Sequence, residues 1–262
     1  MPISPFQQSV LRLLAGQRLP ESHVAGGAAI NRSSSSPRFS ADIDIFHDVA
    51  DDVRAAAECD ARILDSVGYK VTWQLRQASL QRAQVERDGQ LMKLEWCHDS
   101  SFRFFPVQPD TDFGYALHPA DLATNKALAL AGRSEVRDFI DILFLHESYL
   151  SLGAICWAAC GKDEGFNPSS LLGYAKAHMK FREQDLSSEH LARPLVLSDL
   201  KDAWQRAVAQ AEELFVRLPA SEVGCLYLAP TMIPITPDPA DAGFARVIRH
   251  FGSTRGAWPV VA

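Results

Sequence analysis

The chain has 262 residues, of which 47% are hydrophobic and 22% are charged, and its formal net charge is −6. This length and apolar content predict an ordinary globular protein with a substantial core, in one large domain or in one domain with an appendage. The negative charge excludes a surface that binds polyanions over its whole extent, although a local basic patch for RNA is compatible with it.

Cysteine usage and hydropathy indicate the compartment. The five cysteines are odd in number and lack paired C-x-x-C spacing, which is typical of reduced thiols. The first ten residues lack a basic run followed by an apolar core, and no stretch approaches the roughly 18 to 20 apolar residues of a membrane span. We therefore expect a cytoplasmic protein that does not engage a membrane.

The first part of the chain is predicted to mix helices and strands. Apolar spacing predicts a helix over 5–14, a strand over 22–25 that leads into Gly26-Gly27, and a helix start over 28–30. The serine-rich run 31–37 is a predicted loop that leads to a strand over 41–46. A helix over 49–67 follows, and then three antiparallel strands over 69–75, 80–86 and 90–97, with a hairpin turn at Asp88-Gly89.

The second part is predicted to be mostly helical. Helices are expected over 120–131, 135–148, 150–159, 169–180 and 198–218, before a proline-rich stretch between 230 and 239. We divide the chain into a first domain, 1–148, and a mostly helical C-terminal region, 149–262.

Two aspartates on the predicted strand 41–46 form the main candidate site. Successive side chains of a strand face opposite ways, so Asp42 and Asp44 share one face while Ile43 and Ile45 take the other. Two carboxylates this close repel unless a cation lies between them, and Mg²⁺ commonly binds one or two carboxylates together with substrate phosphates. The alternative is a solvated strand edge, but the branched apolar neighbours favour a metal site.

The glycine pair is a candidate phosphate-binding turn. Without Cβ atoms, Gly26 and Gly27 let a substrate approach closely, and the N–H groups of the following helix start favour a triphosphate. Taken alone, the pair fits a plain tight turn equally well. The aspartates downstream favour the phosphate-binding interpretation.

A third carboxylate could come from the strand over 90–97. Glu95 and Lys93 share one face of that strand, opposite Met92, Leu94 and Trp96. Glu95 is our candidate third metal ligand. The alternative, which the pattern favours slightly, is that Lys93 and Glu95 form the ordinary polar face of a half-buried sheet.

Charged residues fall on apolar faces of the two helices after residue 120. Lys126 lies between Leu122 and Leu130 at helical spacing, and Asp138 and Asp141 lie on a helix that is apolar nearly all round. Buried carboxylates cost several kcal/mol unless they are paired, so we expect partners among Arg133, Arg137, Lys126 or a metal. An internal ion pair with an arginine is favoured for Asp138, and a functional role is favoured for Lys126 and Asp141.

Taken together, these motifs resemble the AbiEii-type nucleotidyltransferase family, which contains the toxin halves of bacterial toxin–antitoxin and phage-defence systems. The resemblance spans roughly residues 22 to 145 and rests on Gly26-Gly27, Arg38-x-Ser40-x-Asp42-x-Asp44, Asp121-Leu122-x-x-x-Lys126 and Arg133-x-x-x-Arg137-Asp138-x-x-Asp141. It implies an α+β, polymerase-β-like nucleotidyltransferase fold with a small mixed sheet and a helical C-terminal region. It also implies Mg²⁺ and an NTP.

The resemblance implies a role for each matching residue. Asp42 and Asp44 would be catalytic metal ligands, Lys126 would contact nucleotide phosphates, and Asp141 would be a catalytic carboxylate. The candidate nucleotide-binding residues also include Gly26, Gly27, Arg38 and Ser40. Family members often place a hydroxyl residue directly after the glycine pair, where this chain has Ala28. Backbone donors, Ser40 or a serine of the loop would have to compensate.

The expected reaction is transfer of NMP from an NTP to an acceptor. An RNA 3′ end, especially that of tRNA, is what some toxins resembling this chain modify, and a cognate antitoxin is a candidate partner. The acid-free run of Arg246, Arg249, His250 and Arg255 is either a phosphate-binding patch or a solvated helix end and tail. The alternative functions are a nucleotide- or partner-binding protein of the same fold without catalysis, and a transferase acting on a small molecule such as an aminoglycoside.

Overall fold

The computed structural model describes residues 3–259, which fold into two compact units. The sheet unit contains the chain up to Ser101 together with Pro106–His118, and the helical unit contains Phe102–Phe105 and the chain from Pro119 onward. Helices on either side of residue 148 thus belong to the same compact unit. The division into domains at that residue stays a prediction.

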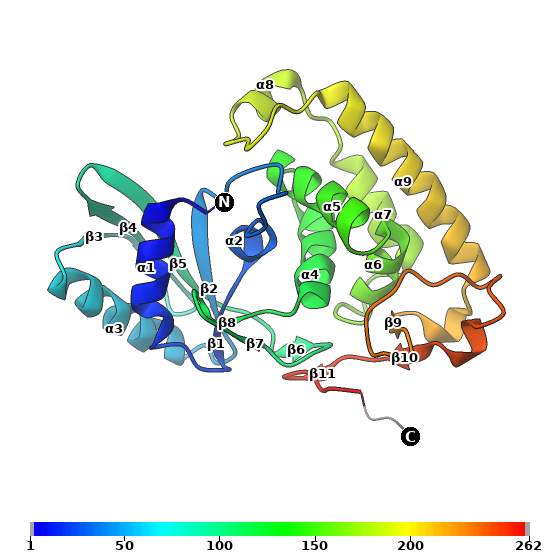
Figure 1. The fold of residues 1–262 in the computed structure, drawn as a ribbon, viewed down its shortest axis with the longest axis horizontal. Helices are drawn as coiled ribbons and strands as arrows, with labels where there is room; N and C mark the ends of the chain where they lie inside the picture. Colours follow the sequence, from blue (N-terminus) through cyan, green and yellow to red (C-terminus); the bar gives the residue numbers. More distant parts are fainter. Residues whose placement is uncertain (1–2, 260–262) are drawn as a thin grey trace. The chain divides into compact units, whose positions relative to one another are not determined.

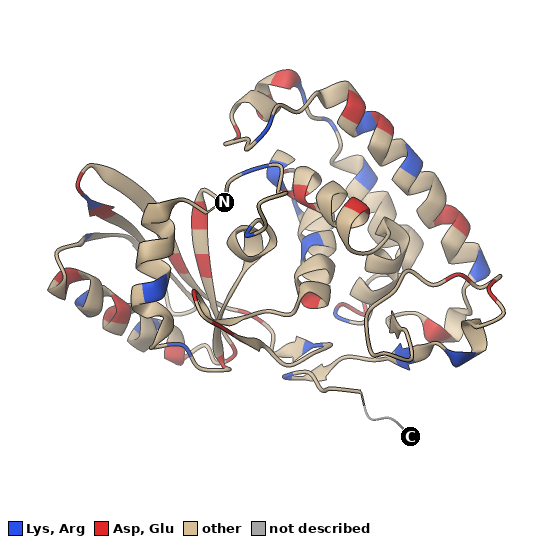
Figure 2. Cartoon of the chain, viewed as in Figure 1, with Lys and Arg blue, Asp and Glu red and all other residues tan. Residues whose placement is uncertain are grey.

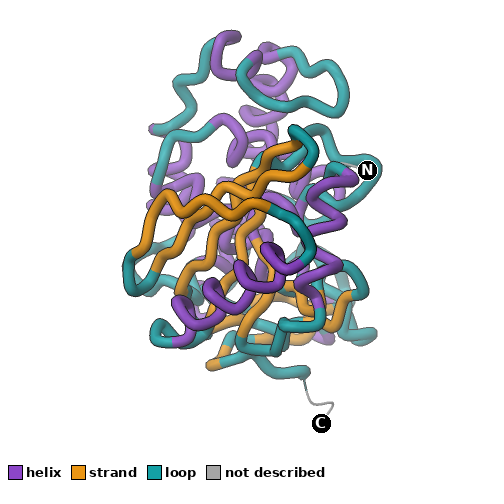
Figure 3. Tube along the Cα trace, turned by 90° about the vertical axis from the view of Figure 1, so that its left-hand side faces the viewer, coloured by secondary structure: helices purple, strands orange, loops and turns teal. Residues whose placement is uncertain are grey.

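The sheet unit is built on a seven-stranded mixed sheet in the order β3-β4-β5-β2-β1-β8-β7 (Figures 1 and 3). Within it, β2 pairs with β5 and β1 with β8 in parallel, and the other neighbours are antiparallel. The predicted α+β class with a small mixed sheet is therefore confirmed. The strands are β1 (Ser22–Ala25), β2 (Asp42–His47), β3 (Lys70–Arg76), β4 (Leu80–Arg87), β5 (Gln90–His98), β7 (Gln108–Asp110) and β8 (Gly114–Ala116).

The two faces of this sheet differ in polarity because its strands alternate apolar and polar residues. Ile43, Ile45, Leu94 and Trp96 are fully buried, and α3 (Asp52–Ser66) packs against β3, β4 and β5. Helix α1 (Pro5–Ala15) starts with a capping box at Ser4 and packs on α3 and β8. The opposite face carries the half-exposed polar residues of β2, β4 and β5. Below, it is called the open face of the sheet unit.

A buried ion pair ties the covered face together. The guanidinium of Arg18 lies 2.6 Å from the carboxylate of Asp60 on α3, and the indole N–H of Trp96 donates to the same carboxylate at 2.7 Å. Arg18 and Asp60 are both almost fully buried. A buried carboxylate with a charged partner and a second donor avoids the desolvation cost that an isolated one would carry.

The helical unit contains the predicted run of helices. They are α4 (Pro119–Gly132), α5 (Val136–Ser148), α6 (Leu152–Ala159), α7 (Pro168–Ala177), α8 (Glu183–Ser187) and α9 (Leu197–Arg217). Helix α6 is buried on all sides, whereas α9 carries charged residues along its length (Figure 2). Among residues 3–259, no single helix has both the length and the apolarity of a membrane span.

The C-terminal segment forms short strands where one interpretation of its basic run expected a solvated helix end and tail, and the phosphate-binding interpretation stays a prediction. Instead of a helix end and tail, β10 (Ile248–His250) pairs with β9 (Leu226–Leu228), and β11 (Ser253–Thr254) pairs with β6 (Phe102–Arg103). Arg249 lies 3.0 Å from the carboxylate of Glu222 and over the ring of Phe244, and a ring nitrogen of buried His250 lies 2.8 Å from the carbonyl oxygen of Phe104. Two of the four basic residues therefore have structural contacts inside the unit.

Candidate active site

The two aspartates lie at the centre of the sheet unit because β2 runs between β1 and β5. The register pairs Asp42 with Lys93 and Asp44 with Glu95 on β5, and pairs Ala25 on β1 with Asp44. Paired residues of neighbouring strands point to the same face. All three predicted carboxylate ligands therefore belong to the open face of the sheet unit, where they are half-buried.

The glycine turn lies directly against this carboxylate row. Gly26 has a φ of +65°, and a Cβ atom there would lie 2.5 Å from Oδ2 of Asp44. At Gly27 a Cβ atom would lie 2.9 Å from both Nη2 of Arg38 and Oγ of Ser40. A Cβ atom at either position would displace these side-chain atoms, since real Cβ contacts are longer. The sheet unit thus brings five predicted residues together around the start of α2 (Gly26–Ile30).

The chain before β2 is held in place by local hydrogen bonds. Oγ of Ser40 donates to the carbonyl oxygen of Asp42 at 2.9 Å, and the Ser40 carbonyl accepts from Nε2 of Gln7 at 2.8 Å. Arg38 is only 2% exposed, and its Nη1 donates to the carbonyl oxygen of Phe39 at 3.0 Å. A guanidinium and a hydroxyl are therefore fixed beside the glycine turn, where they could contact a bound phosphate.

A cation on β5 lies between two of the carboxylates. Nζ of Lys93 is 2.8 Å from Oδ2 of Asp42 and 3.2 Å from Oε1 of Glu95, and Nε of Arg82 on β4 lies 2.5 Å from the same Glu95 oxygen. Partial burial alone would lower the pKa of Lys93, but Asp42 and Glu95 outweigh it and raise that pKa above its ordinary value. We did not predict these partners from the sequence, although the Lys93-x-Glu95 alternation was the available signal.

The donor set suits a hard divalent cation. Carboxylates of Asp42 and Asp44 present oxygen ligands on one face, next to the Gly26–Gly27 turn, and Mg²⁺ usually completes its shell with substrate phosphates and water. Within residues 3–259, no group of three or more His, Cys, Asp or Glu side chains is placed to enclose a metal. Oε1 of Glu95 is already bound by two cations, and the role of Glu95 as a metal ligand stays a prediction.

The other two predicted catalytic residues lie in the helical unit. Lys126 on α4 has a side chain that is 7% exposed, and its Nζ lies 2.7 Å from Oδ1 of Asp138 and 3.0 Å from Oδ2 of Asp141 on α5. Nε of Arg133 lies 2.7 Å from Oδ2 of Asp138. The expectation that Asp138 has partners among these cations is confirmed, whereas Arg137 lies 3.9 Å from Glu135. Lys126 and Asp141 are thus partners in one buried cluster.

Asp121, the first residue of the helical motif, has a structural environment. Its carboxylate accepts the backbone N–H groups of Phe104 and Phe105 at 2.8 and 3.1 Å, and it lies 2.7 Å from Nζ of Lys162. The side chain is fully buried. Asp121 therefore joins the segment after β6, helix α4 and the segment after α6 within the helical unit, a contact that no local sequence pattern indicated.

Comparisons with known proteins agree with this architecture. A protein-family model described as the nucleotidyl transferase AbiEii toxin of a type IV toxin–antitoxin system matches residues 12–217. No curated protein matches the chain. Among solved structures, the MenT4 nucleotidyltransferase toxin of Mycobacterium tuberculosis is similar with a TM-score of 0.59 and 13% identity, over 82% of this chain and 83% of that one.

Two further solved structures are similar at lower scores. A Helicobacter pylori protein has 18% identity and a TM-score of 0.45, over 79% of this chain and 90% of that chain. A nucleotidyltransferase-like antigen of Paracoccidioides brasiliensis has 20% identity and a TM-score of 0.44, over 69% and 90%. The likeness to MenT4 shows that the fold is that of nucleotidyltransferases. Because the family model matches most of its length, this chain belongs to the AbiEii nucleotidyl transferase toxin family of type IV toxin–antitoxin systems and is a nucleotidyltransferase.

Proposed function

We propose that this toxin-family nucleotidyltransferase transfers NMP from an NTP to the 3′ end of an RNA, in particular a tRNA, with Mg²⁺ as its cofactor. One observation carries the proposal. Asp42 and Asp44 lie on the open face of the sheet unit with the Gly26–Gly27 turn against Asp44, so the carboxylates adjoin the turn that would bind phosphate. Nucleotidyl transfer needs that pairing of a metal site with a phosphate site.

Different residues around the turn would bind the metal and the phosphates. Asp42 and Asp44 would hold the metal, which when bound neutralises phosphate charge and favours the attacking hydroxylate. Gly26 and Gly27, which lack Cβ atoms, would let the triphosphate approach the turn, and the Arg38 guanidinium next to Gly27 would contact it. The pyrophosphate would leave in line with the incoming hydroxyl. Positioning of these two groups and neutralisation of the phosphate charge would supply most of the rate acceleration.

We propose roles for the remaining candidate residues as well. One of Asp42, Asp44, Glu95 and Asp141 would accept the proton of the attacking hydroxyl. Ser40 lies beside Gly27 and would replace the hydroxyl that Ala28 lacks, unless backbone donors or a serine of the loop do so. Lys126 would contact the nucleotide phosphates, as the family resemblance implies.

The cellular setting follows from the family. Membership of a type IV toxin–antitoxin family implies a cognate antitoxin. The RNA acceptor rests on the resemblance to toxins that modify RNA. All five cysteines are free thiols in the structure, which fits our proposal that the protein acts in the cytoplasm.

Incubation with each labelled NTP, Mg²⁺ and total bacterial RNA tests the proposal. The native chain is expected to label RNA with one or more NTPs, and an Asp44→Ala chain is expected to label none. Asp65→Ala, an exposed change on α3, is the matched control and should retain full transfer. Binding of NTP without any transfer would show that the chain is a nucleotide-binding protein and not an enzyme. Label on a small molecule but not on RNA would show that the acceptor is a small molecule and contradict the proposed RNA acceptor.

A further inference from the structure

The open face of the sheet unit contains a hollow next to Asp42, and we propose that it holds the terminal nucleoside of the acceptor RNA. The proposal rests on the proposed function and adds the acceptor's binding site to it. The base would lie against the side-chain amides of Gln74 and Gln84, and the ribose hydroxyl would point toward Asp42.

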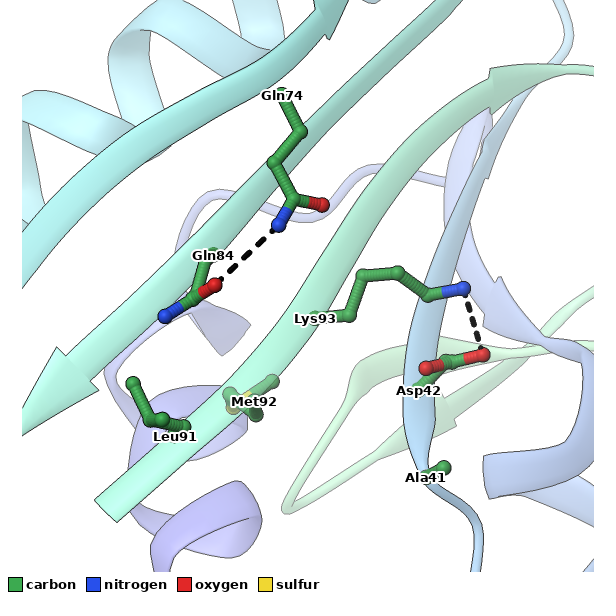
Figure 4. Close-up of a pocket in the computed structure, with 7 residues that line it drawn as sticks. All are labelled: Ala41, Asp42, Gln74, Gln84, Leu91, Met92 and Lys93. Atoms are coloured by element: carbon green, nitrogen blue, oxygen red, sulfur yellow. Dashed lines mark hydrogen bonds and ion pairs between the residues drawn. The ribbon is translucent and has the colours of Figure 1, made fainter. Parts of the chain in front are cut away.

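The hollow measures about 280 Å³, and Figure 4 shows its lining. Lys93 and Asp42 stand on one side of it, and Gln84 and Gln74 stand on the other. Its volume is at the lower end for pockets that bind small molecules, which suits one nucleoside rather than a large ligand. Leu91, a 58% exposed side chain at its border, adds apolar surface against which a base could pack.

The strand order places this hollow opposite the glycine turn. Along the sheet unit the order is β1, β2, β5, β4 and β3, so the turn after β1 lies on one side of the aspartates. The hollow, lined by residues of β3, β4 and β5, lies on the other side. In-line displacement requires the attacking hydroxyl and the leaving pyrophosphate on opposite sides of the phosphorus. If the turn holds the leaving phosphates, the hollow is the side from which the acceptor arrives.

The two glutamines supply the hydrogen-bonding groups that a base needs. Nε2 of Gln74 donates to Oε1 of Gln84 at 3.3 Å, so this contact orients both amides. The other amide atoms, Oε1 of Gln74 and Nε2 of Gln84, lie at the two outer ends of this contact, one as an acceptor and one as a donor (Figure 4). Base edges carry both donors and acceptors, so each amide can form a hydrogen bond with a base in the hollow.

The side-chain amide of Gln74 lies at a register shift between β3 and β4. The register between β3 and β4 shifts between Trp73 and Leu75, so Gln74 is the extra residue. Trp73 lies against Trp96 of the covered face, while Gln74 reaches Gln84 on the open face. Because successive side chains of a strand face opposite ways, Gln74 follows Trp73 onto the open face, where it lines the hollow.

Kinetics on two variants test the proposal. Gln84→Leu and Gln74→Leu remove the hydrogen-bonding groups at positions that are not fully buried, and Gln90→Leu, an exposed change at the start of β5 outside the hollow, is the control. Each of the first two is expected to raise the KM for the RNA acceptor by about tenfold or more. The KM for the NTP should stay within about twofold, because the turn that would hold the phosphates is untouched. An unchanged KM for RNA, or equal effects on both substrates, would overturn the inference.

A cross-linking experiment separates this inference from the proposed reaction. RNA with 4-thiouridine as its 3′-terminal nucleotide is irradiated with the native chain in the absence of NTP, and the cross-linked peptide is identified by mass spectrometry. We expect cross-links within residues 70–98, and their reduction in Gln84→Leu but not in Gln90→Leu.

Cross-links only elsewhere would refute the acceptor site even if transfer to RNA occurs. Transfer of label to protein instead of RNA would refute the nucleoside as the ligand. Absence of all transfer, with cross-links in place, would refute the proposed function alone.

Discussion

The ammonium nitrogen of Lys93 lies 2.8 Å from Oδ2 of Asp42, on the strand next to it. The same ammonium lies 3.2 Å from Glu95, so one cation of the protein neutralises two of the three carboxylates on the open face of the sheet unit. A divalent ion bound by Asp42 and Asp44 would lie close to the positively charged ammonium of Lys93, which also contacts Asp42. The geometry therefore predicts that Lys93 weakens metal binding.

Replacing Lys93 by methionine is expected to tighten divalent metal binding about tenfold, equivalent to about 1.4 kcal/mol, because a like charge next to the ion is removed. Titration with Mn²⁺ followed by electron paramagnetic resonance measures this affinity directly. Lys70→Met is the matched control, since Lys70 forms an exposed pair with Glu86 at the same sheet and should leave the affinity unchanged. Weaker Mn²⁺ binding by the Lys93 variant would show that the lysine supports the site.

Alanine at position 26 should be incompatible with the site. Its Cβ atom would lie 2.5 Å from Oδ2 of Asp44, and the φ of +65° adds a left-handed strain of about 1 kcal/mol. We expect Gly26→Ala to lower transfer by about a hundredfold or more, because the carboxylate must move. Gly68→Ala is the control for strain alone, since φ is +87° there and a Cβ would meet nothing within 4 Å. Equal activity of the two variants would mean that the contact with Asp44 is irrelevant.

Asparagine at position 42 keeps the shape of the side chain but removes its charge. Asp42→Asn is expected to lower nucleotidyl transfer by about a thousandfold, because the metal site loses a formal charge and Lys93 loses one of its two carboxylate partners. The circular dichroism spectrum and the thermal midpoint should change little, since Asp42 is only half-buried. Full activity with a normal spectrum would contradict the proposed metal site.

Lys126 should be important for stability as well as for its predicted role. Lys126→Met would leave the buried carboxylates of Asp138 and Asp141 without this cation, and breaking a buried pair by removing one partner typically costs 3 to 5 kcal/mol, so a loss of about 3 kcal/mol is expected. Urea unfolding measures it. Lys176→Met, which breaks an exposed pair with Glu212, should cost under about 1 kcal/mol. If the first variant were as stable as the second, the cluster would not be structural.

The stability of the sheet unit should fall in mild acid because of His47. This residue is 2% exposed, its Nε2 has no hydrogen-bond partner within residues 3–259, and burial, aided by Arg18, lowers its pKa to about 4. The unfolded chain binds a proton near pH 6.5, whereas the folded chain stays neutral down to about pH 4. The unfolding free energy should therefore be unaffected by His47 above pH 6.5 and decrease by up to about 3 kcal/mol as the pH falls toward 4.

Urea unfolding between pH 4 and 7 measures this dependence. The His47→Gln chain should show a shallower decrease than the native chain over that range, because the ionisable group is gone. An exposed change, His190→Gln, should leave the slope as it is. Identical slopes for all three chains would mean that His47 does not titrate as its burial implies.

Local patterns in the sequence determined much of the site. Alternation along one strand placed Asp42 and Asp44 on a common face, and the apolar surroundings of Lys126 and Asp138 required ionic partners, which the structure contains. Both inferences depend only on neighbours within one element, whose geometry has a fixed period. The fold class and the family also followed from ordered short motifs, and both are confirmed.

Contacts between distant segments were decided only by the tertiary structure. The parallel pairing of β2 with β5 brings Lys93 to Asp42, and nothing near either residue specifies that register. The short strands β6, β9, β10 and β11 have two or three residues, too few for a period to be read, and they exist because they pair with each other. The sequence by itself determined which residues are chemically able to bind metal and phosphate. The tertiary structure decided which cations neutralise them, because an ion pair depends on distance in space and not on separation along the chain.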